Sequence, residues 1–395
     1  MIEKFKTNAE VIENGDKYLY GNHVRMPISM ERGEGVYVFD KDGNKYLDFI
    51  GGIAVNGLGH CHPAIVKCLE ERAHTILHCS NYFYNEPAVQ TAKLIVENSC
   101  FDKVLFANSG AEANEGQIKL ARKYAKDHGH PERFVVITMK NSFHGRTITT
   151  LQATGQDVFH HDFTPLTEGF VYAEPNDLAD LEQLIKANKC AAVMMEVVQG
   201  EGGVMPLDEA YVKGAAKLCE QYDLLLICDE VQVGNGRSGK LYGYMHYGVQ
   251  PDIVSTAKGL AGGLPLGATL LGEKVQDVLS AGTHGSTFGG NPVCCAGAIN
   301  VLSRLDEKML EGVEERSAYI KQELAGAKGV LGVSGLGLML GIQTEKNASD
   351  IIAACREKGV LVIKAKDKLR LLPALNIPME QLQKAVAVIK ACCAE

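Results

Sequence analysis

The chain has 395 residues, of which 46% are hydrophobic and 22% charged, as expected for a globular protein of roughly two domains with a sizeable core. This composition argues against the disordered and fibrous classes. A net charge of −8 provides no basic surface for nucleic acid or an anionic membrane. No apolar run approaches the ~20 residues that a membrane-spanning helix requires.

Cysteine usage and the first residues point to a cytoplasmic location. The twelve cysteines are scattered and include no C-x-x-C pair, so we expect reduced thiols rather than disulfides. The segment at 1–10 lacks the apolar stretch of a signal peptide. The histidines and cysteines at 60–62, 74 and 78–79 fit no standard zinc spacing, and we predict no metal site.

The sequence divides into three successive regions with different patterns. Residues 35–49 predict an antiparallel hairpin around the turn at 42–44. Between about 100 and 290, seven short apolar runs alternate with helical stretches, which predicts an α/β fold with a mostly parallel sheet. After Pro292 we expect a long helix and then a smaller α+β region. The predicted domains are an N-terminal segment at 1–55 that joins the small domain, a large domain at 56–295 and a C-terminal small domain at 296–395.

Two charged residues follow apolar strands of this predicted sheet. Asp229 ends the run that starts at Leu224, and Lys258 follows the strand at 252–254 inside a glycine-flanked segment. Ligands gather at the C-terminal ends of such strands. A lysine there is a candidate amine nucleophile, and an acid beside a pyridine nitrogen would keep that nitrogen protonated, so the pair suggests pyridoxal phosphate chemistry. The alternatives are an exposed loop lysine and a metal-binding or helix-capping acid, although no Walker A motif precedes Asp229.

Three further segments offer sites for anions and a planar ring. Ser109 begins a helix whose free N–H groups suit a phosphate, although Ser109 and Glu112 also match a simple capping box. The glycine-rich loop at 284–292 carries hydroxyls that suit an anion, or is only a turn. Phe143 is a candidate for stacking on a cofactor and Arg146 for clamping a carboxylate; the alternative is a core phenylalanine beside a surface arginine.

Six motifs in order, at residues 109–114, 143–146, 199–203, 229–232, 257–259 and 285–292, resemble those of the class III aminotransferases, in particular the acetylornithine/ornithine branch. The resemblance runs from about Gly33 to the C-terminus. It implies a fold-type I pyridoxal-phosphate-dependent transferase in which residues 56–295 bind the cofactor and a seven-stranded, mostly parallel sheet forms the large domain. It also implies a homodimer with active sites shared between subunits.

The resemblance assigns a role to each candidate residue. Lys258 would carry the Schiff base, Asp229 would pair with the pyridine nitrogen and Gln232 would contact the ring hydroxyl. The other cofactor contacts would come from Ser109, Gly110, Ala111, Phe143, Val231 and, from the partner subunit, Thr287. Substrate would be bound by Arg146, Arg370, Glu201 and Ser286, with Glu201 masking Arg370 while the amino donor is bound.

The implied reaction moves the δ-amino group of N2-acetylornithine to 2-oxoglutarate, giving N-acetylglutamate 5-semialdehyde and glutamate in arginine biosynthesis. Ornithine, succinylornithine or 4-aminobutyrate as donor, or an aminomutase, remain alternatives. A nicotinamide dehydrogenase is disfavoured because the glycines at 335–341 run through a strand without opening a helix. A binding protein without catalysis would not require Lys258. Two departures from the family pattern are Val197, where a proline is usual, and Asn235, at a usually apolar position, which would put the donor in doubt if it borders the pocket.

Overall fold

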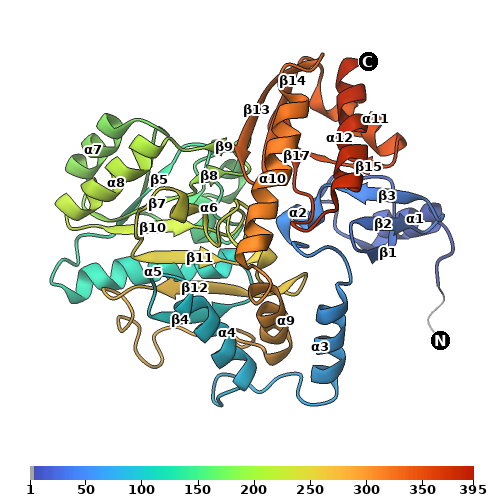
Figure 1. The fold of residues 1–395 in the computed structure, drawn as a ribbon. Coiled ribbons are helices and arrows are strands. Elements are labelled where there is room, and N and C mark those ends of the chain that lie inside the picture. The colour runs from blue at the N-terminus through green and yellow to red at the C-terminus, as the bar shows by residue number, and fades with distance from the viewer. Residues whose placement is uncertain (1–3) are drawn as a thin grey trace.

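A computed structural model describes residues 4–395. Its largest sheet has seven strands, and their order is β4 (Lys103–Ala107), β12 (Gly267–Leu271), β11 (Ile253–Thr256), β10 (Leu225–Asp229), β7 (Cys190–Met195), β5 (Val135–Met139) and β6 (Phe170–Ala173). Neighbouring strands are parallel except that β12 is antiparallel to both β11 and β4. The predicted α/β fold with a seven-stranded, mostly parallel sheet is therefore confirmed (Figure 1).

Both faces of this sheet are buried, which explains why its strands are continuous apolar runs. In β10 the alternate residues Leu225 and Ile227 pack into one core with Leu120 of α5 (Gly110–Asp127). Leu226 and Cys228 face the other core. The core on that face contains residues of α4 (Glu86–Glu97), α7 (Leu178–Ala187), α8 (Glu209–Gln221) and α9 (Pro292–Leu302). The sheet is thus the middle layer of three.

The two ends of the chain share a second core. The predicted hairpin is present as β2 (Tyr37–Asp40) and β3 (Lys45–Asp48), and β1 (Met30–Glu34) and β15 (Val360–Leu361) complete its sheet. A further sheet contains β13 (Val330–Leu336), β14 (Met339–Thr344), β17 (Lys368–Leu371) and β16 (Ile363–Ala365). Both sheets lie beside the large one in Figure 1. The domain boundaries at 55 and 295 stay predictions; the shared core also contains Leu58 and Ile65, from beyond the boundary at 55.

The single long helix expected after Pro292 is in fact two helices. α9 ends at Leu302, and α10 (Glu307–Leu324) begins after Asp306, whose carboxylate accepts the Met309 N–H at 2.8 Å. The side-chain cap starts a new helix, because it satisfies a free N–H of the first turn. The change of direction sends the chain from the large sheet to the second core.

The remaining elements are short connections and surface helices. The helices are α1 (Asn8–Tyr18), α2 (Gly51–Ala54), α3 (Pro63–Ala73), α6 (Ile148–Ala153), α11 (Ala348–Glu357) and α12 (Met379–Ala394), and a two-stranded ribbon joins β8 (Val198–Gln199) to β9 (Met205–Pro206). Four 3₁₀ turns complete the fold: η1 (Asp157–Phe159), η2 (His161–Phe163), η3 (Gly243–His246) and η4 (Lys258–Ala261). In the part of the chain that the structure describes, no helix combines the length and apolar character needed to cross a bilayer.

Candidate active site

A cavity of about 450 Å³ opens where β10, β11 and the N-terminus of α5 meet. Most of the residues predicted from the sequence line it: Ser109, Gly110, Ala111, Phe143, Arg146, Asp229, Val231, Gln232 and Lys258. Four do not: Glu201, Ser286, Thr287 and Arg370. The first group comes from four separate segments that fold to the C-terminal edge of the sheet, where parallel α/β sheets bind ligands.

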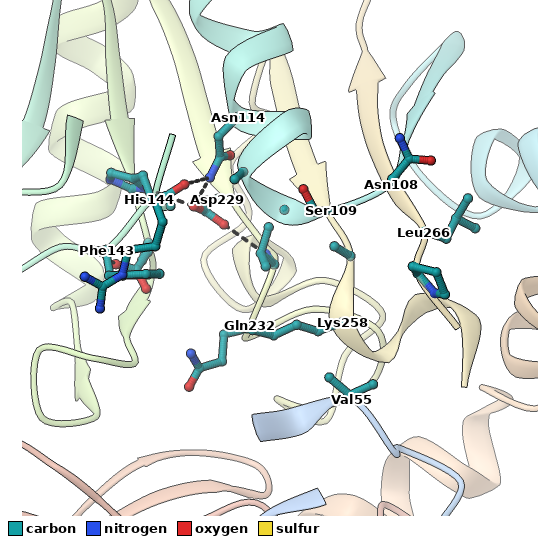
Figure 2. A pocket seen from close by; sticks show the side chains of 18 of the residues that line it. Val55, Asn108, Ser109, Asn114, Phe143, His144, Asp229, Gln232, Lys258 and Leu266 are labelled. Atoms are coloured by element: carbon teal, nitrogen blue, oxygen red, sulfur yellow. Dashed lines mark hydrogen bonds and ion pairs between the residues drawn. The ribbon is translucent and has the colours of Figure 1, made fainter. Parts of the chain in front are cut away.

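Asp229 is fixed by a buried network on one wall of the cavity. Its Oδ2 accepts from Asn114 Nδ2 at 2.7 Å and from His144 Nδ1 at 2.8 Å, and its Oδ1 accepts the Val231 N–H at 3.0 Å. Figure 2 shows the bonds that join these side chains. A carboxylate has about four acceptor positions, so Asp229 keeps acceptor capacity for one more donor. The network therefore holds the Asp229 carboxyl group in a fixed orientation.

Lys258 begins η4, directly after Ala257 and the end of β11. Its φ of 43° lies in the left-handed region, which a non-glycine residue adopts only when its surroundings enforce it. Burial lowers the pKa of the Lys258 amine, while the negative charges of Glu201 and Asp229 oppose that shift. An amine with a lowered pKa is more often neutral, as a nucleophile or proton acceptor must be.

The N-terminus of α5 faces the same cavity. Ser109 caps the helix by accepting the Glu112 N–H at 3.2 Å, and Glu112 reaches back to the Asn108 N–H at 2.8 Å. A Cβ on Gly110 would lie 2.6 Å from Val231 Cγ1, so only glycine lets the helix approach this closely. The cap leaves the N–H groups of Gly110 and Ala111 without a side-chain partner among the described residues, and such groups suit a phosphate.

Phe143 and Arg146 come from the loop between β5 and α6. The Arg146 guanidinium lies 4.1 Å from the Phe159 ring centroid and 5.2 Å from that of Phe143, while the residue itself is exposed at the cavity. Stacking on aromatic rings holds the guanidinium without using its N–H groups. Arg146 therefore keeps its donors for a carboxylate.

Arg370 and Glu201 form an ion pair beside the cavity. Arg370 Nη1 lies 2.5 Å from Glu201 Oε1, and Nη2 lies 3.2 Å from Oε2. Burial disfavours the charged form of Glu201, but the Arg370 charge and hydrogen bonds outweigh burial and lower the Glu201 pKa. Gln232 Oε1 accepts from Arg370 at 3.0 Å. Its predicted contact with a ring hydroxyl stays a prediction, because the structure directs its amide to this pair.

Ser286 and Thr287 lie in the loop before α9. Ser286 Oγ accepts from Asn108 Nδ2 at 2.9 Å and from the Gly289 N–H at 3.0 Å, so its hydroxyl holds the loop against the end of β4. Thr287 is exposed. Neither residue lines the cavity of this single chain.

The two departures noted in the sequence lie in the core. Val197 has no exposed surface, and its side chain packs so closely against Gly243 that a Cβ there would lie 2.7 Å from Val197 Cγ2. Asn235 is 4% exposed and is not one of the residues that line the cavity. The concern that Asn235 shapes the substrate pocket directly is therefore not supported, and its side chain points instead toward the backbone before Lys258.

Sequence reasoning missed His144, Asn114 and Glu196. His144 lies between Phe143 and Arg146, the two residues for which that motif was chosen. Asn114 lies one helical turn after Gly110, on the same face of α5. Glu196 follows β7 and accepts the Phe143 N–H at 2.8 Å. A search for polar residues after every strand would have found Glu196.

The fold and this site together define a class: an α/β enzyme of fold type I built to hold pyridoxal 5′-phosphate. The residues fit that cofactor, because a helix N-terminus suits its phosphate, Asp229 has acceptor capacity for its pyridine nitrogen, and Lys258 offers an amine for its aldehyde.

The comparisons with known proteins agree. The model of the family "Aminotransferase class-III" matches residues 19–393. The chain is 45% identical to an acetylornithine aminotransferase of Haemophilus ducreyi over 98% of this chain and 100% of the relative, and 43% identical to a succinylornithine transaminase of Salmonella newport over 96% of each. A crystal structure of the ornithine aminotransferase of Toxoplasma gondii superposes with a TM-score of 0.95 at 33% identity, covering 99% of this chain and 96% of that one. The chain belongs to the class III aminotransferases, which use pyridoxal phosphate.

Proposed function

We propose that this aminotransferase moves the δ-amino group of N2-acetylornithine to 2-oxoglutarate, a step of arginine biosynthesis that yields N-acetylglutamate 5-semialdehyde and glutamate. The observation that carries the proposal is a pair of arginines: Arg146 lines the cavity and has free donors, and Arg370 lies beside the cavity and is held by Glu201. The name of the Haemophilus relative, 45% identical to this chain, supports the same donor.

The two arginines suit substrates that carry different numbers of carboxylates. Acetylornithine carries one carboxylate, which Arg146 binds while the Glu201 carboxylate neutralises Arg370. Glutamate and 2-oxoglutarate carry two carboxylates, so the second needs Arg370 after Glu201 has moved away. Glu201 is suited to this exchange, since its side chain is 29% exposed whereas that of Arg370 is 3% exposed.

Lys258 is proposed to carry the proton transfers. Bound pyridoxal phosphate supplies an aldehyde that takes up the amino group and an electron-withdrawing ring. Lys258 would accept and return a proton at its Nζ, a role suited to an amine whose pKa is lowered by burial. Asp229 would face the pyridine nitrogen and favour its protonated form.

The test is turnover by the purified protein with acetylornithine and 2-oxoglutarate, measured as glutamate formed. Lys258→Ala should lower kcat by about 10²–10⁴-fold or more, because it removes the proton carrier. Lys274→Ala is the control, since Lys274 pairs with Asp252 at 2.9 Å outside the cavity. No glutamate from acetylornithine, with turnover of another ω-amine, would overturn the substrate; full activity of Lys258→Ala would overturn the mechanism.

Succinylornithine is the second candidate donor, because a succinylornithine transaminase is 43% identical to this chain. The succinyl group adds a carboxylate at the end of the acyl chain. The ratio of kcat/KM for the two donors decides between them, and a ratio in favour of succinylornithine would replace the first proposal with the second.

We also propose that the enzyme is a homodimer in which Thr287 completes the partner's site. The loops at 76–85 and 284–291 are joined by Asn81, Asn85 and Asn291, whose side-chain amides donate to backbone carbonyls across the two loops. This surface is strongly apolar: Tyr82, Phe83 and Tyr84 are 94%, 70% and 99% exposed. Exposed apolar patches of this kind mark association surfaces.

Subunit complementation tests the dimer. A Lys258→Ala chain and a Thr287→Ala chain are each expected to be impaired, but co-expressed chains should regain activity, because one site of the mixed dimer then holds both native residues. Light scattering of the purified protein reports the mass. A monomer, or no gain in the mixed sample above the Thr287→Ala protein alone, would refute the shared site.

A further inference from the structure

Asn235 is a buried polar residue with an unusual backbone. It lies between two glycines in the segment after β10, is 4% exposed and has a φ of 54°. Asparagine is one of the few non-glycine residues that adopt this left-handed region readily. A buried amide is costly unless it is hydrogen-bonded, so the Asn235 side chain needs a specific partner.

That partner is the chain leading to Lys258. Asn235 Nδ2 donates to Thr256 Oγ1 at 2.8 Å and to the Ala257 carbonyl at 3.0 Å. The carbonyl is only an acceptor, so it fixes which end of the amide faces it. On the far side of the lysine, a Cβ on Gly259 would lie 3.4 Å from Asn235 Cβ. Asn235 therefore bonds to the two residues before Lys258 and lies close to the residue after it.

The backbone at Lys258 needs such support. Its φ of 43° places a long side chain on a left-handed residue, a conformation that persists only where neighbouring contacts enforce it. The carbonyl that Asn235 binds belongs to the peptide unit directly before this residue. The direction in which the Lys258 side chain leaves the backbone thus depends on the orientation of that peptide.

We propose that Asn235 is a positioning residue for Lys258: through Thr256 and the Ala257 carbonyl it orients the peptide from which the lysine side chain enters the cavity. The inference rests on the proposed function, in which Lys258 carries the chemistry. Both half-reactions use the same lysine, so Asn235 affects their common step and not the binding of either substrate. A displacement of about 1 Å in such a group is enough to lower a rate about a hundredfold.

Two variants distinguish the effect of the Asn235 hydrogen bonds from the effect of its backbone conformation. Asn235→Leu removes both donors and places an apolar residue at the left-handed position. Asn235→Asp keeps the size and the tolerance for positive φ but offers no donor to the Ala257 carbonyl. We expect both to lower kcat by about tenfold to a hundredfold with acetylornithine and with glutamate, while the KM of each substrate stays near the parent value. Thr256→Val removes one of the two contacts and should have a smaller effect of the same kind.

Asn8→Leu is the matched control. Asn8 is also buried, at 8% exposure, and its side chain makes bonds to Asp40, Ser29 and Lys41 in the N-terminal sheet region. The control loses at least as many hydrogen bonds as Asn235→Leu but does not contact the cavity. It should lower the thermal midpoint and leave kcat unchanged, which separates loss of stability from loss of positioning.

A second readout does not depend on turnover. The absorption band of pyridoxal phosphate attached at Lys258 is titrated with pH in the resting holoenzyme, and the rate of cofactor uptake by the apoenzyme is followed at the same band. Both should change in Asn235→Leu and Asn235→Asp and stay at parent values in Asn8→Leu. Parent-like titration, uptake and kcat in the Asn235 variants would overturn the inference while Lys258→Ala remains inactive. An active Lys258→Ala protein would instead overturn the proposed function.

Discussion

Two sides of the cavity hold charge in different ways. On the Asp229 side, the carboxylate is 4% exposed and accepts from Asn114, His144 and the Val231 backbone. On the Arg370 side, the guanidinium is just as buried, but its ionic partner Glu201 stands at the end of a glycine-flanked loop and is partly open to solvent. One charge is fixed by several donors from different elements, whereas the other is balanced by one removable acid.

The difference matches what each side must do. A cofactor stays through both half-reactions, so its acid needs one orientation, and several buried hydrogen bonds enforce that orientation. Two substrates alternate at the other side, so the arginine needs a counter-charge that leaves. An exposed partner leaves at lower cost than a buried one, because water replaces the lost hydrogen bonds.

Asp229→Asn should have the largest effect of the variants that probe this comparison. It removes the fixed negative charge and places an amide against the Asn114 and His144 donors. Loss of one preorganised electrostatic contact lowers kcat by about 10²–10³-fold, and we expect a fall of that size together with weaker cofactor binding. Steady-state kinetics and cofactor titration measure the two effects.

Asp252→Asn is the control for that variant. Asp252 accepts the Leu226 N–H at 2.8 Å and pairs with Lys274, but it precedes β11 and lies outside the cavity. It should lower stability without a fall in kcat. If Asp229→Asn keeps kcat within a few-fold of the parent, the fixed charge is not required.

The Asp229 side of the cavity was easier to predict from the sequence than the Arg370 side. Asp229 and Lys258 each follow a buried apolar strand, so their place at one sheet edge follows from strand polarity alone. Arg370 lies in β17 and Glu201 in the turn between β8 and β9, 169 positions away, so no local pattern joins them. Only the resemblance to a family suggested that pair.

Other features depend on tertiary contacts that no window of sequence contains. The reversal of β12 between β11 and β4 was not predicted, because a short buried strand has the same composition in either direction. Asn235 was noticed as unusual, but the sequence reveals neither its positive φ nor the bond of its side chain to the Ala257 carbonyl. His144 was hidden because its partner Asp229 is 85 positions away.

Glu201→Gln probes the Arg370 side. Its effect should be smaller than that of Asp229→Asn and should differ between the two substrates. The amide keeps the shape but not the charge, so Arg370 stays available for the carboxylate of an α-amino acid. A charge-assisted hydrogen bond contributes roughly 1.5–3 kcal/mol. We therefore expect the ratio of kcat/KM for acetylornithine to that for glutamate to fall about tenfold to a hundredfold.

The matched control for Glu201→Gln is Glu174→Gln, which breaks an ion pair with Lys140 at 2.7 Å in which both side chains are about half exposed. Exposed pairs contribute little, and the substrate ratio should not move. An unchanged ratio in Glu201→Gln would mean that Glu201 does not gate Arg370.

Glu196 links the two sides, and the last expected effect is a change in stability with pH. Its Oε1 accepts the Phe143 N–H at 2.8 Å and its Oε2 accepts the Gly200 N–H at 3.3 Å, next to Glu201. Burial raises the pKa of Glu196 from its ordinary value of 4.5 to about 7; the Asp229 charge adds to this shift and His144 opposes it. In the folded state Glu196 therefore keeps a proton that the unfolded chain releases between these two values.

The free energy of unfolding should consequently fall as pH rises from about 4.5 to about 7, since the folded state binds more protons in that window. Glu196→Gln stays neutral and should lack the part of this fall that Glu196 causes, so its stability relative to the parent should improve by roughly 2–3 kcal/mol between pH 5 and pH 8. Urea unfolding of both proteins with saturating cofactor measures the difference, and Glu345→Gln at an exposed position is the control. A difference that stays constant with pH would show that Glu196 is ionised throughout this range and is a second negative charge on the Asp229 side.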